Sequence, residues 1–205
     1  MARTRVQLST GLPELDRVLR GLMPGDNIVW QVDSIDDYLP FVVPYAKFAK
    51  EHRQKLIYFR FADHAPLLSA DSGAEIFEFE TERGFEPFLA GIHRVISTNS
   101  RGTMYLFDCL SELAPDWRSD RMLGNFFMLT CPYLYDRAAI AYFALLRNYH
   151  SFHAVNPIAN TTQILINAYR HKNKIYIHPL KVQHRYSHTM YMLHVREGNE
   201  FCPVT

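Results

Sequence analysis

Apolar residues form short continuous runs, which alternate with stretches where apolar side chains recur at helical spacing. The continuous runs predict buried strands at residues 27–32, 55–61, 75–79, 103–107 and 138–146. The helical spacing predicts helices at residues 12–19, 37–51, 85–97 and 120–135. In the last part of the chain, short strands are expected at residues 161–169, 174–178 and 189–195, with a polar turn at 170–173.

This alternation of strands and helices predicts a three-layer α/β fold. Strands that are apolar along their whole length are typical of a mostly parallel sheet with helices on both faces. The last strands are not separated by helices, so we expect a C-terminal antiparallel extension. No repeat, low-complexity tract or flexible linker divides the sequence. Residues 1–205 are therefore expected to form a single domain, either by itself or as the N-terminal part of a longer protein.

Composition and charge narrow the range of partners. Hydrophobic residues make up 48% of the chain and charged residues 21%, and the formal net charge is +1. That balance gives no electrostatic reason to expect nucleic acid or a membrane surface as a partner. The longest apolar run, residues 138–146, is much shorter than the roughly 20 residues of a membrane span. The three cysteines form no C-x-x-C pair, so we expect a protein of the reducing cytoplasm.

The loop after the first strand carries the most specific chemistry. Residues 33–38 contain three carboxylates and neither glycine nor lysine. A loop that binds a triphosphate needs backbone N–H groups freed by glycine, a lysine charge and a helix N-terminus. This loop offers only the helix N-terminus and surrounds it with negative charge. The sequence therefore predicts that a nucleoside triphosphate does not bind here.

Further polar residues follow the other predicted strands. Ligands of an open α/β sheet bind beyond the carboxyl ends of its strands. The candidate cofactor-binding residues are those at the strand ends, namely Asp33, Ser34, Asp36, Asp37, Asp63, Asp108 and Arg147.

These residues have a structural and a functional interpretation. In the structural one, Asp36 and Asp37 cap the following helix, and Asp108 accepts hydrogen bonds that fix a loop. In the functional one, Asp33, Asp63 and Asp108 converge on a hard cation, which prefers several oxygen ligands. Spacing along the chain does not decide whether these carboxylates meet in space.

Other reactive residue types give no catalytic or metal site. His184 and His188 lie four positions apart, but a metal-binding pair at that spacing needs a helix, and none is predicted there. Ser111 lacks the G-x-S-x-G turn that exposes a nucleophilic serine. We therefore predict no catalytic residue and no bound metal.

Several segments resemble the core of RecA/KaiC-type ATPases. Residues 9–16 and 21–26 resemble the segment that leads into that core, and residues 104–113 resemble its Walker B strand. In that family the aspartate matched by Asp108 supports a magnesium ion on the nucleotide. Of the acidic pair that activates water, only Asp63 is matched. The resemblance implies a RecA-like P-loop NTPase fold whose phosphate loop is degenerate.

A closer resemblance covers longer stretches of the chain. Similarity to the N-terminal, P-loop-lacking domain of some bacterial phosphoenolpyruvate (PEP) synthase or pyruvate phosphate dikinase-like (PEP/pyruvate-binding) proteins is carried by residues 25–38, 107–111, 122–127, 145–152 and 178–182. In those proteins this domain lies ahead of nucleotide-grasp and phosphohistidine modules. No phosphohistidine motif occurs in the present sequence, so phosphoryl transfer would reside in other modules.

The resemblance implies a RecA-like accessory or regulatory domain that neither hydrolyses nucleotide nor needs a cofactor. Its partners would be the other domains of a PEP synthase-like phosphotransferase. One alternative is an atypical KaiC-like ATPase that binds Mg-nucleotide through Asp63, Asp108 and Arg147, with a lysine brought from elsewhere. A second alternative is a scaffold domain that forms homo-oligomers.

Overall fold

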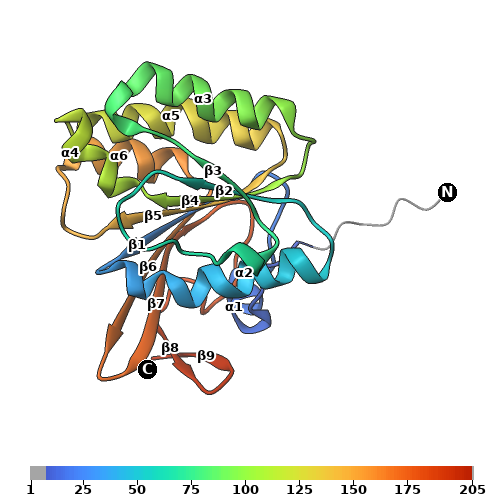
Figure 1. Ribbon diagram of the computed structural model, residues 1–205. Coiled ribbons are helices and arrows are strands. Elements are labelled where there is room, and N and C mark those ends of the chain that lie inside the picture. The colour runs from blue at the N-terminus through green and yellow to red at the C-terminus, as the bar shows by residue number, and fades with distance from the viewer. Residues whose placement is uncertain (1–7, 205) are drawn as a thin grey trace.

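The computed structural model describes residues 8–204 and shows an α/β fold built on a nine-stranded sheet (Figure 1). Its strand order is β3-β2-β4-β5-β1-β6-β7-β8-β9. The parallel part consists of β1 (Asn27–Val32), β2 (Leu56–Arg60), β3 (Glu75–Glu78), β4 (Met104–Cys109), β5 (Ile140–Leu146) and β6 (Ile164–His171). The first strand of the sequence therefore lies in the interior of the sheet, between β5 and β6.

The antiparallel extension continues the sheet from β6. It consists of β7 (Lys174–Val182), β8 (His194–Glu197) and β9 (Glu200–Pro203). Lys172 and Asn173 have positive φ angles of 47° and 62°, which is the backbone of a tight hairpin turn between β6 and β7. The predicted polar turn and the mostly parallel sheet with an antiparallel end are thus confirmed.

Helices cover both faces of the sheet (Figure 1). One face carries α1 (Pro13–Leu19) and α2 (Leu39–Glu51), and the other carries α3 (Phe85–Thr98), α5 (Arg121–Asp136) and α6 (Phe152–Thr161). Short helical segments complete the connections, namely η1 (Ile35–Asp37), η2 (Ala70–Ser72), η3 (Thr81–Arg83), η4 (Leu110–Glu112) and α4 (Leu113–Trp117).

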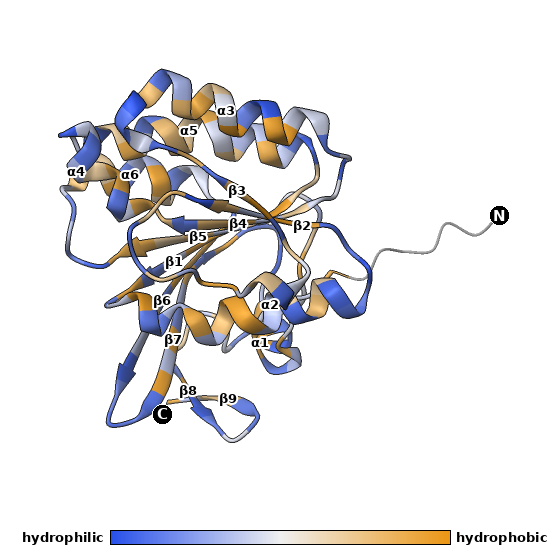
Figure 2. Cartoon of the chain, in the orientation of Figure 1, coloured by the Kyte–Doolittle hydropathy of each residue, from blue (hydrophilic) through white to orange (hydrophobic). Residues whose placement is uncertain are grey.

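The sheet separates two apolar cores. Trp30 of β1 belongs to the core under α1 and α2, whereas Val29 belongs to the core under α3, α5 and α6. Because successive side chains of a strand point to opposite faces, one strand supplies both cores. Figure 2 shows hydrophobic residues concentrated on the central strands, whereas the C-terminal strands β7 to β9 also carry hydrophilic ones. This double burial explains the continuous apolar runs in the sequence.

The end of the chain differs from the sequence prediction. Residues 152–161 form α6, which was not predicted, and the following strand begins at Ile164 rather than at residue 161. The apolar residues Phe152, Val155, Ile158 and Ala159 recur at helical spacing, so the sequence does carry a helix signal here. Pro157 inside the segment argues against a helix, because an interior proline removes a backbone hydrogen-bond donor.

The last predicted strand is also mostly wrong. Within residues 189–195, the structure assigns only the final two to a strand, β8, and a further strand, β9, follows. Turn hydrogen bonds from the Met190 N–H to the Ser187 carbonyl and from the Met192 N–H to the Thr189 carbonyl hold the preceding backbone. Local turns therefore replace the extended conformation that the apolar side chains suggested.

Candidate functional site

The carboxyl end of β1 lies where chain connections pass to opposite faces of the sheet. The segment after β1 leads to α2 on one face, and the segment after the neighbouring β5 leads to α6 on the other. A crevice at such a switch point is the usual ligand position in open α/β sheets. Asp33 and Arg147, the residues directly after these two strands, are brought together there.

Asp33 and Arg147 form a two-pronged ion pair. The Arg147 Nε donates to Asp33 Oδ1 and its Nη2 donates to Asp33 Oδ2, each at 2.8 Å. The guanidinium carbon also lies 4.8 Å from the ring centroid of Tyr169 on β6. The side chain of Asp33 is 46% exposed and that of Arg147 is 26% exposed. This pair is therefore accessible to solvent at the mouth of the crevice.

The backbone of the loop after β1 is closed upon itself. The Asp37 N–H donates to the Ser34 carbonyl at 3.1 Å, and the Tyr38 N–H donates to the Ile35 carbonyl at 3.0 Å. The Ser34 hydroxyl donates to Asp37 Oδ2 at 3.1 Å. Across residues 33–38 no residue adopts a positive φ angle. The N–H groups of Asp37 and Tyr38 are therefore engaged within the loop, and the loop lacks the positive φ angles with which glycine-rich loops turn their N–H groups toward phosphate.

Arg170 of β6 binds this loop through the carboxylate of Asp37 and the backbone carbonyl of Asp36. Its Nε lies 3.4 Å from Asp37 Oδ1, and its Nη2 donates to the Asp36 carbonyl at 3.2 Å. The loop is therefore less negative than its composition indicates, because Arg147 after β5 and Arg170 of β6 pair with two of its three carboxylates. Those arginines lie far along the sequence, so local composition does not reveal them.

Asp36 and Asp37 do not cap α2. A turn of 3-10 helix, η1, stands between them and that helix, whose N-cap is Tyr38 without a side-chain capping bond. Tyr38 itself is fully buried in the core under α2. The capping interpretation was wrong because the chain uses these residues to close the loop before the helix begins.

Asp108 lies at a second switch point, between β2 and β4, and is fully buried. It accepts hydrogen bonds from the Tyr58 hydroxyl, from Arg60 Nη1 at 2.8 Å and from the N–H groups of Phe61 and Ala62, each at 2.9 Å. These donors fix the segment that leaves β2. The geometry agrees with the structural interpretation of Asp108, since its oxygens are already engaged by protein groups.

Asp63 does not join the other two carboxylates. Its side chain is exposed and lines a small separate hollow with Glu82, Glu112 and Asp116. Among residues 8–204, no group of three or more histidine, cysteine, aspartate or glutamate side chains is arranged to hold a metal ion. The alternative cation site at Asp33, Asp63 and Asp108 is therefore not assembled.

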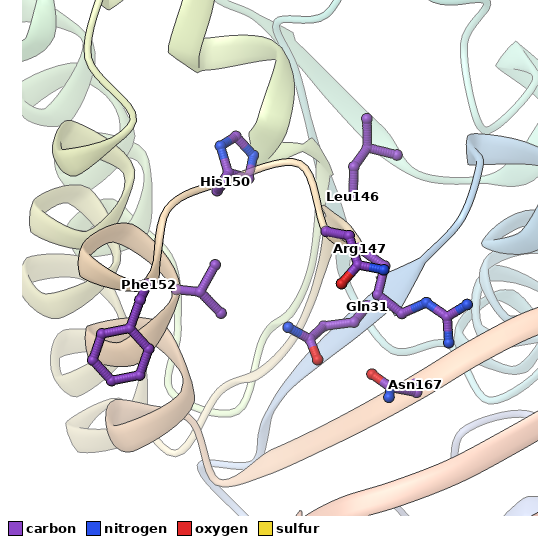
Figure 3. Close-up of a pocket in the computed structure, with 8 residues that line it drawn as sticks. Gln31, Leu146, Arg147, His150, Phe152 and Asn167 are labelled. Carbon is purple, nitrogen blue, oxygen red and sulfur yellow. The ribbon is translucent and has the colours of Figure 1, made fainter.

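Sequence reasoning missed a cavity of about 520 Å³ beside the Asp33–Arg147 pair. Its lining includes three carboxamides, from Gln31, Asn148 and Asn167. Figure 3 labels Gln31 and Asn167 among them. A signal for this site was present in the sequence, because Gln31 interrupts the apolar run of β1. An interior strand seldom carries a polar side chain toward its helices without a partner for it.

His150 forms one wall of this cavity and is hydrogen-bonded to Ser111 of η4, which also binds the end of β5. Its Nε2 lies 2.7 Å from the Ser111 hydroxyl oxygen, which accepts the Leu146 N–H at 2.9 Å. Burial lowers the pKa of His150, although the nearby Asp120 raises it. The Ser111 side chain is buried, with the residue only 2% exposed. It therefore holds the β5–α6 connection in place and offers no accessible nucleophile.

Comparisons with known proteins add no relative. No family model matches the chain, and no curated protein matches it significantly. In the part of the chain that the structure describes, no helix combines the length and apolar character that a membrane crossing requires.

Proposed function

We propose that this chain is a RecA-like domain that does not hydrolyse nucleotide and that regulates or assists a PEP synthase-like phosphotransferase. The observation that carries the first part is the closed loop after β1. Its N–H groups at Asp37 and Tyr38 are satisfied internally, and its carboxylates at Asp33 and Asp37 face arginines. A triphosphate would have to displace these contacts and approach three carboxylates without a lysine.

The RecA-like assignment rests on the sequence resemblance and is supported by the sheet. The strand matched to the family's phosphate-loop strand is β1, which lies in the interior between β5 and β6. The strand matched to Walker B is β4, whose Asp108 lies at a strand end as the resemblance requires. The regulatory role rests on the resemblance to PEP synthase-like proteins alone.

The first part is tested by calorimetric titration with Mg-ATP and by a steady-state hydrolysis assay on the same preparation. We expect neither tight binding nor turnover. Tight binding accompanied by hydrolysis would overturn the proposal.

The regulatory part is tested by adding the chain to a PEP synthase-like enzyme from the same organism. Phosphotransfer that is unchanged at saturating chain, without complex formation, would exclude that role.

One observation favours the atypical ATPase as a second candidate. Two guanidinium groups, from Arg147 and Arg170, lie against the loop that precedes α2. If they exchanged their carboxylate partners for phosphate, they could supply the positive charge that the missing lysine would provide. An Arg147→Ala, Arg170→Ala double variant separates the candidates, because it should abolish ATP binding only if the second candidate is correct.

A further inference from the structure

The outer side of α5 carries apolar side chains that nothing covers in the part of the chain that the structure describes. Met128, Leu129 and Tyr135 are 42%, 51% and 45% exposed, and Pro132 is exposed as well. These four residues face away from the sheet, because the opposite side of the helix, with Phe127, lies in the core beneath it. An apolar stripe of this kind on a helix marks a surface that binds another molecule.

Opposite charges stand at the two ends of this stripe. Arg121 is the first residue of α5 and Asp136 is its last, and residues 122–135 between them carry no charge. Arg121 lies two helical turns before Met128, and Asp136 lies two turns after Leu129, so both share the exposed side of the helix. In the described chain neither of the two charged side chains forms an ion pair or a hydrogen bond. Both charges are therefore free to pair with another molecule.

This order of charges fits a second copy of the same helix that runs in the opposite direction. If two α5 helices cross antiparallel between Met128 and Leu129, Arg121 of one copy lies opposite the partner's Asp136, because both are equally far from the crossing point. A two-fold axis repeats this pair at the other end of the stripe. The antiparallel arrangement also opposes the two helix dipoles. A parallel arrangement would instead bring like charges together.

The neighbouring helix α3 repeats the pattern. Its outer side carries Glu86 and Arg94, with Ala90 midway between them, and all three are exposed. Within the described residues, the side chains of Glu86 and Arg94 form no ion pair and no hydrogen bond. If two α3 helices cross antiparallel at Ala90, Glu86 of one copy lies opposite the partner's Arg94. This helix is therefore also complementary to a reversed copy of itself.

The packing of α3 against α5 brings the two crossing points to one level. The rings of Phe88 and Phe126 lie 5.5 Å apart between centroids, and His93 Nε2 lies 3.2 Å from Thr130 Oγ1. The helices therefore run in the same direction, side by side along one face of the sheet (Figure 1). With this offset, the midpoint of the α3 charges falls within about one residue of the midpoint of the α5 charges, a rise of roughly 1.5 Å. A single two-fold axis can therefore satisfy both helices.

The balance of charges favours a second copy over an anionic partner. Two cations, Arg94 and Arg121, and two anions, Glu86 and Asp136, frame the apolar stripe. Nucleic acid or an anionic membrane surface would meet the two carboxylates as well as the two guanidinium groups. Another copy of the chain presents the opposite charge at each of the four positions.

We propose that two copies of this chain associate face to face through α3 and α5, around a two-fold axis level with Met128. The apolar stripes cover one another, Arg121 pairs with the partner's Asp136, and Glu86 pairs with the partner's Arg94. This proposal goes beyond the function proposed above, because it does not involve the strand ends or the loop after β1. It also gives the homo-oligomer considered among the alternatives a defined surface.

Sedimentation equilibrium of the parent chain tests the association. We expect a reversible dimer at about 100 µM protein in about 50 mM salt, where charge pairs at the surface are weakly screened. Leu129→Asp should weaken the dimer, because it places a carboxylate inside the covered stripe. A parent chain that remains monomeric at this concentration would overturn the proposal and leave the face to a different protein.

Charge reversals assign the dimer to this surface. Arg121→Glu and Asp136→Arg should each weaken association by about tenfold, since the two-fold axis turns one substitution into two like-charge contacts. Lys47→Glu is the matched control, because Lys47 is a 73% exposed cation on α2, which covers the other face of the sheet. The urea midpoint of each variant checks that it is folded. A dimer that both reversals leave as tight as the control would refute the proposed surface.

An equimolar mixture of the Arg121→Glu and Asp136→Arg variants tests the antiparallel arrangement. In a dimer with one chain of each kind, the two substituted positions face one another with opposite charges, and the two unsubstituted positions keep the native pair. The mixture should therefore associate about tenfold more tightly than either variant alone. Association that is not restored by mixing would exclude the antiparallel pairing of α5.

A monomeric parent chain leaves the proposed function untouched, since that function is judged by nucleotide turnover and by its effect on a phosphotransferase. Conversely, ATP hydrolysis would overturn the proposed function and leave the dimer to be judged by sedimentation. The two proposals therefore fail independently.

Discussion

Two of the aspartate–arginine pairs at the carboxyl ends of strands in this sheet differ in their surroundings, namely Asp108 with Arg60 and Asp33 with Arg147. In one pair, Asp108 is fully buried and Arg60 is 16% exposed, and the aspartate also binds a hydroxyl and two backbone N–H groups. In the other, Asp33 is 46% exposed and its partner Arg147 lies at the rim of a cavity. The same chemistry therefore holds the fold together at one switch point and remains accessible to ligands at the other.

The comparison shows why charge alone does not identify a site. A buried ion pair is costly to break because the remaining charge is stranded in a poorly polarisable environment. An exposed pair is worth little to stability, since water and salt screen both partners. The exposed pair can therefore be rearranged when a ligand binds, whereas the buried one cannot change without the fold.

The largest expected effect comes from Asp108→Asn. The substitution strands the Arg60 guanidinium and weakens the hydrogen bonds to Phe61 and Ala62, so it should cost roughly 3–5 kcal/mol of unfolding free energy. Urea denaturation followed by circular dichroism measures this loss. Asp63→Asn is the control, because that carboxylate is exposed. A loss for Asp108→Asn below that of an ordinary surface substitution would mean that the buried network does not stabilise the fold.

A smaller effect is expected from Arg60→Lys. Arg60 donates from Nη1 to Asp108 and from Nη2 to the His64 carbonyl, so one planar group bridges two acceptors. A lysine ammonium keeps the charge but loses this fork, which should cost about 1–2 kcal/mol. The same denaturation experiment applies, with Arg147→Lys as the matched change in the exposed pair. Equal losses in the two variants would show that the buried and the exposed ion pair contribute equally to stability.

Acid should weaken the protein through three histidines that are partly or fully buried. Burial lowers the pKa of His93, His150 and His194, so in the folded state they bind protons less readily than in the unfolded chain. Stability is then fully present above the unfolded pKa near 6.5 and falls as pH drops toward the lowered values, by at most about 1.4 kcal/mol per pH unit for each group.

Thermal unfolding between neutral pH and mildly acidic pH measures this slope. His150→Gln should reduce it, because this histidine beside the cavity no longer titrates. His171→Gln serves as the control, since that side chain is exposed on the β6–β7 hairpin. A slope that is unaffected by His150→Gln would show that acid does not act at the cavity end of the sheet.

The smallest effect belongs to the exposed pair. A double-mutant cycle of Asp33→Asn and Arg147→Gln should give a coupling energy of about 0.2–1 kcal/mol, because both side chains are partly in water. The coupling should decrease further at about 1 M salt, where the Debye length is near 3 Å. A coupling energy as large as the loss expected for Asp108→Asn would remove the distinction between the two switch points.

Much of the parallel sheet could be predicted from the sequence, because a strand buried on both faces needs apolar side chains at consecutive positions. The run at β5 is apolar throughout, the run at β1 is interrupted only by Gln31 after its first residue, and Pro13 and Gly21 bracket α1. The helix α6 was not predicted, because Pro157 lies inside it and proline is unfavourable in a helix interior. The antiparallel end was located only in part, because the turns before β8 depend on backbone hydrogen bonds.

The candidate site could be predicted only as a set of strand ends. The list of residues after β1, β2, β4 and β5 was sufficient to find Asp33, Arg147 and Asp108. It did not say that Asp63 stands apart, or that Gln31 and Asn167 face one another across neighbouring strands. Strand order and register, which follow from the whole sheet, decide these relations.

By itself, the sequence indicated that residues 27–32 form a buried strand and that the loop after it lacks the glycine and lysine of a triphosphate-binding loop. Both conclusions depend on local properties, namely side-chain polarity and the backbone freedom of glycine. Only the tertiary structure decided which carboxylate is buried and which arginine it meets. Arg147 lies 114 positions from Asp33, and their contact exists because β1 and β5 pair in the sheet. Burial and ion pairing are properties of neighbours in space, so they follow from the packed sheet.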